Sequence, residues 1–492
     1  MNLVVLLDMA ASGHGDRIAL TTATERVTFA QLQEQARQGA GVLHQHNAGT
    51  AVLVGRNGPM MPRLLFAAAL AGVPFTALNY RLSSEQILEQ IARLDRPVIV
   101  ADDDYLDLLK HLDHTMSVSE FTGGAAGAAP YAASPDGTDI ASQLFTSGTT
   151  AQPKIVPLRH ENLFSYVTGT VEFGGADPDE AALVCVPPYH VAALGSALTN
   201  LYAGRRVTYL PDFDPSAWLS LARRENVTTA MVVPTMLARI VDACDGIADV
   251  PTLRLISYGG SKMAMPVLER ALSAFPGCGF VNAYGLTETS STITVLTPED
   301  HHAALTSDDP DVAARLASAG RPVPGIELEV RDDDGTALPA GETGELWVRG
   351  PQVAGEYVGQ GSVLDAGGWF PTKDRARIDT AGYVFIDGRS DDTIIRGGEN
   401  IAPAEIEDVL LRHSDIADAV VVGAPDEEWG QRLVAVVVLR DAATLTVDDV
   451  KDWVRSHVRG SRTPDDVVWR EDIPQTATGK ILRRQIVAEL QN

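Results

Sequence analysis

Five short apolar runs between residues 182 and 285 decide the fold: ALVCVPP (182–188), RRVTYLP (205–211), VTTAMVVP (227–234), LRLISYGG (253–260) and CGFVNAYG (278–285). Each run has the length and composition of a buried strand. Segments with helical spacing separate them, such as SAWLSLARREN (216–226) and TMLARIVDAC (235–244). Because parallel strands need a crossover connection, this alternation predicts βαβ units and a largely parallel sheet.

A similar pattern covers the first hundred residues, but beyond about Gly320 apolar residues recur at every second position. The segment 326–350 contains an Asp-Gly turn between two alternating runs, which is typical of a hairpin. Helices and strands alternate again after residue 389, so we place a domain boundary near 389–391. The expected fold is α/β, with a large N-terminal domain (1–389) of parallel α/β sheets plus a small β-barrel-like section. A small α+β C-terminal domain (390–492) follows.

The charge balance restricts the partners. The 492 residues include 39 Lys and Arg against 65 Asp and Glu, a formal net charge of −26. Such acidity argues against nucleic acid and anionic membrane surfaces, which usually require a broad basic face. No apolar run reaches the roughly 18 residues of a membrane span, and Asp8 interrupts the short N-terminal run. Three cysteines without a pairing pattern favour a reducing, cytoplasmic location.

A loop rich in hydroxyl groups is the strongest local signal. FTSGTTAQPK (145–154) combines Ser and Thr side chains, a glycine and a lysine between a predicted strand and a helix expected from about Glu161. Many donors beside a helix N-terminus suit a polyanion, so the segment predicts a phosphate-binding loop. It is not a Walker A loop, because Pro153 precedes Lys154. Taken alone, the segment is also compatible with a surface turn.

Two further motifs follow predicted strands. YGGS (258–261) and YGLTET (284–289) each stand at the carboxyl end of an apolar run, where open α/β sheets bind ligands. Thr287 can donate a hydrogen bond to a phosphate, and Glu288 offers the hard oxygen that Mg²⁺ prefers. As isolated motifs both are ordinary, since many strands end in a glycine turn.

The loop 145–154, YGGS and YGLTET occur in this order along the chain, and four later motifs follow them. With this series of motifs the chain resembles the adenylate-forming superfamily of acyl- and aryl-CoA synthetases, nonribosomal adenylation domains and luciferases. The later motifs are GWFPTKD (368–374), GYVFIDGR (382–389), GGENIAPAEIE (397–407) and PQTATGK (474–480). The pattern is closest to benzoate-type acyl-CoA ligases. The resemblance implies that a carboxylate and ATP form an acyl-adenylate and pyrophosphate, after which the thiol of coenzyme A attacks the adenylate. ATP, Mg²⁺ and coenzyme A are the implied cofactors.

The same resemblance assigns nucleotide-binding residues. The β- and γ-phosphates would contact Thr146, Ser147, Gly148, Thr149, Thr150 and Lys154. Adenine would lie beside Gly259, Gly260 and Ser261, near Tyr284 and Gly285. Thr287 would contact the α-phosphate and Glu288 the Mg²⁺ ion. Asp374 and Arg389 would bind the ribose hydroxyls.

The resemblance also makes Lys480 the catalytic cation. A positive charge near the α-phosphate would stabilise the transition state of adenylate formation more than the ground state. Because Lys480 lies in the predicted small domain, a rotation about a hinge at Asp391 would bring it in and remove it. Gly397 and Gly398 would replace it during thiol attack, since glycines permit close approach of the pantetheine arm.

The segment PPYHVAAL (187–194) bears on the substrate. The family places an aromatic residue or histidine at the position of His190, as a gate between acyl pocket and thiol tunnel. Amino-acid-activating members carry an aspartate nearby, whereas this chain has Val191, Ala192 and Ala193. A buried substrate amine would therefore lack a partner, which predicts a small apolar acyl or aryl carboxylate.

Three alternatives stay open. A discrete carrier protein, rather than coenzyme A, could accept the acyl group, and the oligomeric state, a homodimer included, is undecided. A nucleotide-binding scaffold without activity is a third reading, against which the intact Lys480, Glu288, Asp374 and Arg389 count. The chain also departs from the family pattern at Ala151, Ile155 and Lys373, where relatives have glycine.

Overall fold

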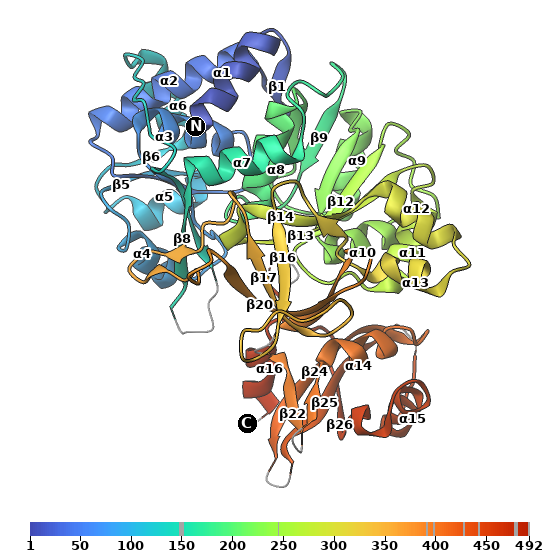
Figure 1. Cartoon of the computed structure of the whole chain (residues 1–492). Coiled ribbons are helices and arrows are strands. Elements are labelled where there is room, and N and C mark those ends of the chain that lie inside the picture. The colour runs from blue at the N-terminus through green and yellow to red at the C-terminus, as the bar shows by residue number, and fades with distance from the viewer. Residues whose placement is uncertain are drawn as a thin grey trace.

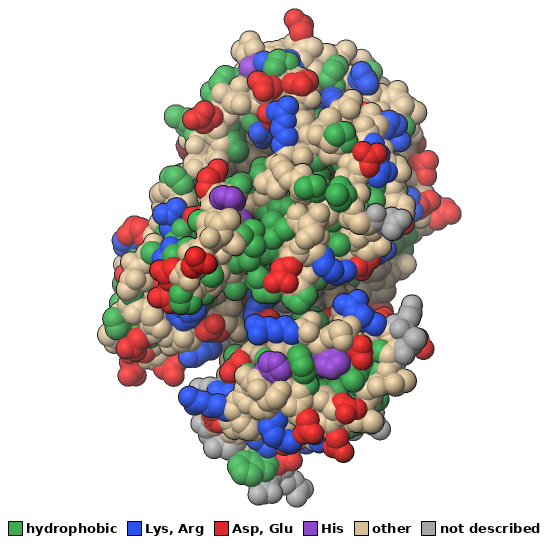
Figure 2. Space-filling model, turned by 90° about the vertical axis from the view of Figure 1, so that its right-hand side faces the viewer, with side chains coloured by type: hydrophobic (Ala, Val, Ile, Leu, Met, Phe, Trp, Pro, Cys, Tyr) green, Lys and Arg blue, Asp and Glu red, His purple; other side chains and the backbone are tan. Residues whose placement is uncertain are grey.

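The computed structural model of the chain describes residues 1–146, 152–244, 246–389, 392–396, 399–426, 429–440, 443–476 and 481–490. The polypeptide forms a large lobe and, below it, a smaller lobe built from the last part of the chain (Figure 1). Within the described residues, no helix has both the length and the apolar character needed to cross a bilayer. Basic and acidic side chains are interspersed on the face seen in Figure 2, rather than gathered into one basic surface.

The predicted alternation of strands and helices forms a nine-stranded sheet. Its order is β15 (Arg321–Pro322), β14 (Ser291–Leu296), β13 (Gly279–Leu286), β12 (Leu255–Gly259), β11 (Thr229–Val232), β9 (Ala181–Val184), β10 (Arg206–Tyr209), β1 (Ile18–Thr21) and β2 (Arg26–Thr28). The six strands from β13 to β1 in this order run parallel, and the five apolar runs of the sequence supply five of them. All five runs therefore end at one edge of the sheet.

A second, six-stranded sheet lies beside the first. Its order is β6 (Thr115–Ser117), β5 (Pro97–Ala101), β3 (Thr50–Val54), β4 (Phe75–Ala77), β7 (Ile140–Thr146) and β8 (Lys154–Arg159). One hydrophobic core joins both sheets through the helices between them. These helices are α1 (Leu3–His14), α2 (Phe29–Gln45), α3 (Met60–Ala71), α6 (Val118–Gly127), α7 (His160–Thr170) and α8 (Val191–Tyr202).

Other helices cover the outer faces of the two sheets. The six-stranded sheet packs against α4 (Ser84–Ile91) and α5 (Asp103–Leu109). The nine-stranded sheet packs against α9 (Pro215–Arg224), α10 (Pro234–Asp242) and α11 (Met265–Ala274), with α12 (Pro298–Thr306) and α13 (Pro310–Ala314) beyond β14. Each sheet is thus apolar on both faces, as expected for parallel strands.

The segment with period two forms a small antiparallel sheet, as expected. Its order is β16 (Glu327–Arg331), β17 (Gly344–Arg349), β20 (Phe370–Ile378) and β21 (Val384–Arg389). A separate hairpin consists of β18 (Glu356–Tyr357) and β19 (Gly361–Ser362). The antiparallel sheet shares its core with β13 and β14. This packing places it beside the edge at which the parallel strands end.

The small lobe has an α+β architecture, which confirms the predicted fold class. It contains the hairpin β22 (Ile394–Arg396) and β23 (Glu399–Ile401), the sheet β24 (Ile416–Asp426), β25 (Gly430–Leu439) and β26 (Asp466–Trp469), and the helices α14 (Pro403–Leu410), α15 (Val447–His457) and α16 (Arg483–Leu490). Helix α14 lies near the large lobe and β22 lies away from it (Figure 1). The Nζ atom of Lys262 is 2.6 Å from an Asp408 oxygen on α14, so this ion pair joins the lobes. The boundary at 389–391 stays a prediction.

Candidate active site

Asp374 lies between a phenol and a guanidinium. The Tyr284 hydroxyl donates to its Oδ2 atom at 2.6 Å, and Arg389 donates to Oδ1 at 3.0 Å. The register of β20 and β21 places Asp374 directly opposite Arg389, while Tyr284 comes from β13 of the large sheet. Only 7% of the Asp374 side chain is exposed. Two residues predicted to bind ribose and one predicted to lie near adenine therefore meet at one point.

The electrostatics of this cluster keep both partners of Asp374 as hydrogen-bond donors. Burial, and then the negative charge of Asp374, raise the pKa of Tyr284, so its phenol stays a donor. Burial would lower the pKa of Arg389, but Asp374 reverses this effect and raises it. A carboxylate has about four acceptor positions, and the contacts above occupy one on each oxygen. Asp374 can therefore accept further bonds from a diol.

Lys373 explains one departure from the family pattern. Its backbone has a φ of +64°, a left-handed conformation that glycine adopts without strain. Its ammonium group lies 3.2 Å from Glu345 in a largely exposed ion pair. Lys373 thus points away from Asp374. It places a Cβ atom at a position whose backbone conformation favours glycine.

Replacing Lys373 by glycine should make the protein about 1 kcal/mol more stable than replacing it by alanine, because alanine keeps the strained Cβ atom. Both substitutions remove the ammonium group, so the lost pair with Glu345 cancels in the comparison. Chemical denaturation of the two variants measures the difference. An alanine variant that is as stable as the glycine variant would contradict the strain argument.

Glu288 and Lys154, from distant parts of the chain, meet at Tyr357. Glu288 lies on a short 3-10 helix, η1 (Thr287–Thr289), directly after β13. The Tyr357 hydroxyl donates to Oε1 of Glu288 at 2.8 Å, and the Lys154 ammonium lies 4.3 Å from the centre of the Tyr357 ring. A carboxylate suited to a metal and a cation suited to a phosphate are therefore neighbours. Tyr357 was not predicted from the sequence.

The turn after η1 is strained and firmly held. Ser290 and Ser291 have φ angles of +57° and +112°, both in the region that disfavours side chains. The buried Gln352 amide donates to the carbonyl oxygens of Thr289 and Thr292 at 3.0 and 2.8 Å. The Ser290 hydroxyl donates to the Gln352 carbonyl at 2.8 Å. These bonds fix the turn that directly follows Thr287 and Glu288 on η1.

The setting of the phosphate loop differs from the sequence expectation. We expected residues 145–154 to connect a strand to a helix, but β8 follows the loop and pairs antiparallel with β7. The loop therefore closes a hairpin, and α7 begins six residues beyond Lys154. The cause is the run Ile155 to Leu158, whose buried side chains suit a strand. Thr146 and Lys154 stand opposite each other in this register.

The glycines near the predicted adenine site serve the packing of the chain itself. A Cβ atom on Gly259 would lie 2.1 Å from the Ala283 carbonyl oxygen, and one on Gly285 would lie 1.8 Å from that of Ser291. Gly260 has a φ of +86°, and Ser261 follows it after β12. Close strand contacts thus account for Gly259 and Gly285.

His190 follows β9 and immediately precedes α8. Its Nε2 atom is buried and has no hydrogen-bond partner among the residues that the structure describes. Burial, and secondly the charge of Arg81, lower the pKa of His190 to about 4. The ring is therefore uncharged at neutral pH.

Comparison with known proteins identifies the family. Residues 7–358 match the AMP-binding enzyme family, and residues 405–480 match the AMP-binding enzyme C-terminal domain. The chain belongs to the AMP-binding enzyme family. This confirms the resemblance to adenylate-forming enzymes drawn from the motifs.

Three relatives of this AMP-binding enzyme show the range of the family. It is 31% identical to the fatty acid–[acyl-carrier-protein] ligase ScoC of Streptomyces coeruleorubidus, over 94% of this chain and 91% of that protein. It is 32% identical to a feruloyl-CoA synthase of Amycolatopsis sp, over 94% and 93%. The o-succinylbenzoate CoA synthetase (MenE) of Bacillus subtilis, solved with the acyl-adenylate intermediate OSB-AMP, is 28% identical with a TM-score of 0.86, over 98% and 97%.

Several predicted site residues of this AMP-binding enzyme lie outside the described residues. They are Ser147, Gly148, Thr149, Thr150, Asp391, Gly397, Gly398 and Lys480, together with the departure at Ala151. Their roles stay predictions. Within the described ranges, no group of three His, Cys, Asp or Glu side chains could hold a metal ion by itself. Mg²⁺ commonly binds through one or two carboxylates plus substrate phosphates, so Glu288 fits such a site.

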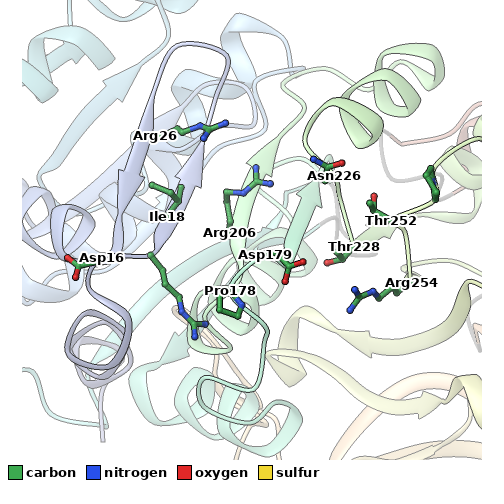
Figure 3. Close-up of a pocket in the computed structure, with 12 residues that line it drawn as sticks. Asp16, Ile18, Arg26, Pro178, Asp179, Arg206, Asn226, Thr228, Thr252 and Arg254 are labelled. Carbon is green, nitrogen blue, oxygen red and sulfur yellow. The ribbon is translucent and has the colours of Figure 1, made fainter.

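A cavity of about 740 Å³ lies at the opposite edge of the large sheet, where β9 to β12 begin (Figure 3). Arg26, Arg206 and Arg254 line it together with Asp16 and Asp179. Arg206 is already paired with Glu225 at 3.0 Å. No predicted site residue from the described ranges lines this cavity, so it is separate from the candidate active site.

Proposed function

We propose that this AMP-binding enzyme is an ATP-dependent carboxylate–CoA ligase that activates an apolar acyl or aryl acid. One observation carries the proposal: Asp374, held by Tyr284 and Arg389, lies at the strand ends where an open α/β sheet binds its ligand. A nearly buried carboxylate with further acceptor positions suits the ribose hydroxyls of ATP. Gly259, Gly260 and Ser261 then face adenine, with Tyr284 beside it.

The phosphates extend from the ribose toward η1 and the β7–β8 hairpin. Thr287 contacts the α-phosphate, and Lys154, Thr146 and the loop residues 147–150 hold the β- and γ-phosphates. Glu288 would hold Mg²⁺. When bound, Mg²⁺ neutralises part of the charge of the triphosphate. The chain's net charge of −26 makes these local cations necessary for binding a polyanion.

The reaction has two steps. A carboxylate oxygen attacks the α-phosphorus of ATP, and the bond to pyrophosphate breaks, which gives the acyl-adenylate. Lys480 stabilises the charge that develops on the phosphate oxygens. The thiolate of coenzyme A then attacks the acyl carbon, and AMP leaves. Rotation of the small domain about Asp391 exchanges Lys480 for Gly397 and Gly398 between these steps.

His190 and its neighbours favour an uncharged acyl group. The neutral imidazole offers one buried acceptor or donor, and Val191 and Ala192 add apolar surface that is partly exposed beside it. Val191, Ala192 and Ala193 offer no acid with which a substrate ammonium group could pair. The feruloyl-CoA and o-succinylbenzoate-CoA relatives support an aryl acid, whereas the relative ScoC supports a carrier protein as an alternative acceptor. Three free cysteines fit a cytoplasmic enzyme.

The test measures pyrophosphate release with ATP and Mg²⁺ across a panel of aliphatic, aromatic and polycyclic acids. We expect carboxylate-dependent pyrophosphate release, and release of AMP on addition of coenzyme A. Release of AMP only with an added carrier protein would show that the carrier protein, and not coenzyme A, accepts the acyl group. Absence of pyrophosphate release with every acid would refute the proposed enzyme. Light scattering of the same sample decides whether the enzyme is a homodimer.

A further inference from the structure

Tyr357 contacts both charged groups that hold the triphosphate, although it stands in neither the phosphate loop nor η1. Resting on the function proposed above, we propose that Tyr357 is a positioning residue that fixes Glu288 and Lys154 for the magnesium complex of ATP. Its hydroxyl acts on the carboxylate and the face of its ring acts on the ammonium group. One side chain thereby sets the relative position of the metal ligand and the phosphate ligand.

The contact with Glu288 selects which oxygen is free. The phenol donates to Oε1 at 2.8 Å, which fixes the rotation of the carboxylate and leaves Oε2 for the ion. Partners that orient a metal-binding group in this way commonly affect metal affinity as strongly as weak ligands do.

The contact with Lys154 leaves all three ammonium hydrogens available. A cation 4.3 Å from the centre of a tyrosine ring is attracted to the negative face of the ring without using a directional hydrogen bond. Lys154 can therefore be held in place and still donate to phosphate oxygens. A carboxylate partner would instead compete with the phosphates for the same donors.

The backbone of Tyr357 is tied to the elements that carry both partners. The amide of Ala354 donates to the Glu288 carbonyl at 2.8 Å, which joins the segment to η1. The amide of Val358 donates to the Ile155 carbonyl at 3.0 Å, which joins it to β8 next to Lys154. The Arg159–Glu356 ion pair, at 2.6 Å, adds a second link to β8. Tyr357 is thus a fixed point between η1 and β8, the two elements that carry Glu288 and Lys154.

The test separates the two contacts. Tyr357→Phe removes the hydroxyl and keeps the ring under Lys154, whereas Tyr357→Leu removes both. Tyr383→Phe is the matched control, because Tyr383 also donates to an acid, Asp300, at 2.6 Å and also packs under an arginine, away from the site. The readouts are thermal unfolding without ligand, steady-state kinetics of pyrophosphate release, and binding of a non-hydrolysable ATP analogue with Mg²⁺ or with EDTA.

We expect Tyr357→Phe to weaken binding of the analogue in Mg²⁺ about 10- to 100-fold, and to change binding in EDTA less than 3-fold. Tyr357→Leu should weaken binding in EDTA as well, by about 3- to 10-fold, because Lys154 loses its support. Tyr383→Phe should change binding of the analogue neither in Mg²⁺ nor in EDTA. Equal losses with Mg²⁺ and EDTA for Tyr357→Phe, or no loss at all, would overturn the inference. If the wild-type protein fails to bind the analogue, the proposed function fails instead.

Discussion

Replacing Lys480 by alanine should slow acyl-adenylate formation about 10²- to 10³-fold, the usual effect of losing one group that stabilises developing charge. The loss should fall on the first step alone, since Lys480 is expected to leave before the thiol arrives. Thioester formation from a supplied acyl-adenylate should stay within a few-fold of the wild-type rate. Pyrophosphate release measures the first step, and CoA-dependent AMP release measures the second.

A lysine on the same lobe provides the control for Lys480. The ammonium of Lys451, on α15, donates to the Asp465 carbonyl at 2.7 Å, far in sequence from the motif PQTATGK. Lys451→Ala should leave both steps unchanged, apart from a small loss of stability. If Lys480→Ala slows both steps equally, a single arrangement of the lobes serves both reactions and the rotation is refuted.

Replacing Asp374 by alanine should lower kcat/KM for ATP about 10²- to 10³-fold. The ribose would lose its two acceptors, and hydrogen bonds to a charged group are each worth about 1.5–3 kcal/mol. Arg389 and Tyr284 would also lose their shared partner, so the free energy of unfolding should fall by about 1.5–3 kcal/mol. Initial-rate kinetics with varied ATP and chemical denaturation measure the two effects.

Asp300→Ala separates stability from binding. Asp300 accepts a bond from the Tyr383 hydroxyl at 2.6 Å and pairs with Arg321 at 3.7 Å, which closely parallels the surroundings of Asp374. It lies on α12, outside the site, so its loss should destabilise the protein without changing the KM for ATP. An equal change in KM for both variants would show that Asp374 acts only through stability.

The edge of the sheet that carries the candidate site could be predicted, because parallel strands all end at the same edge. The runs that became β12 and β13 each end in a glycine motif, so their loops had to meet at one edge. Asp374 and Arg389 were instead assigned to one ribose site by the resemblance to the family, and the register of the hairpin β20–β21 places the two residues opposite each other. The strand ends thus follow from local pattern and chain connectivity, whereas the ribose residues required the family motifs.

The contacts that were missed depend on packing between distant segments. The strand β8 was overlooked because residues 155–158 form a short apolar run without strict alternation, which a pattern cannot separate from a helix start. Tyr357 lies in a two-residue strand, and no motif connects it to Glu288 or Lys154. The left-handed backbone of Lys373 was likewise hidden, since a lysine gives no local sign of a positive φ.

The ion pair between Lys262 and Asp408 has a further consequence for the catalytic cycle. Lys262 directly follows the segment expected to face adenine, so the ion pair that joins the lobes lies one residue away from the proposed base pocket. The two side chains are 47% and 38% exposed, and a pair this open contributes at most about 1 kcal/mol. An ion pair this weak changes the equilibrium between orientations of the small lobe several-fold at most. The proposed rotation can therefore break and re-form the pair within each turnover.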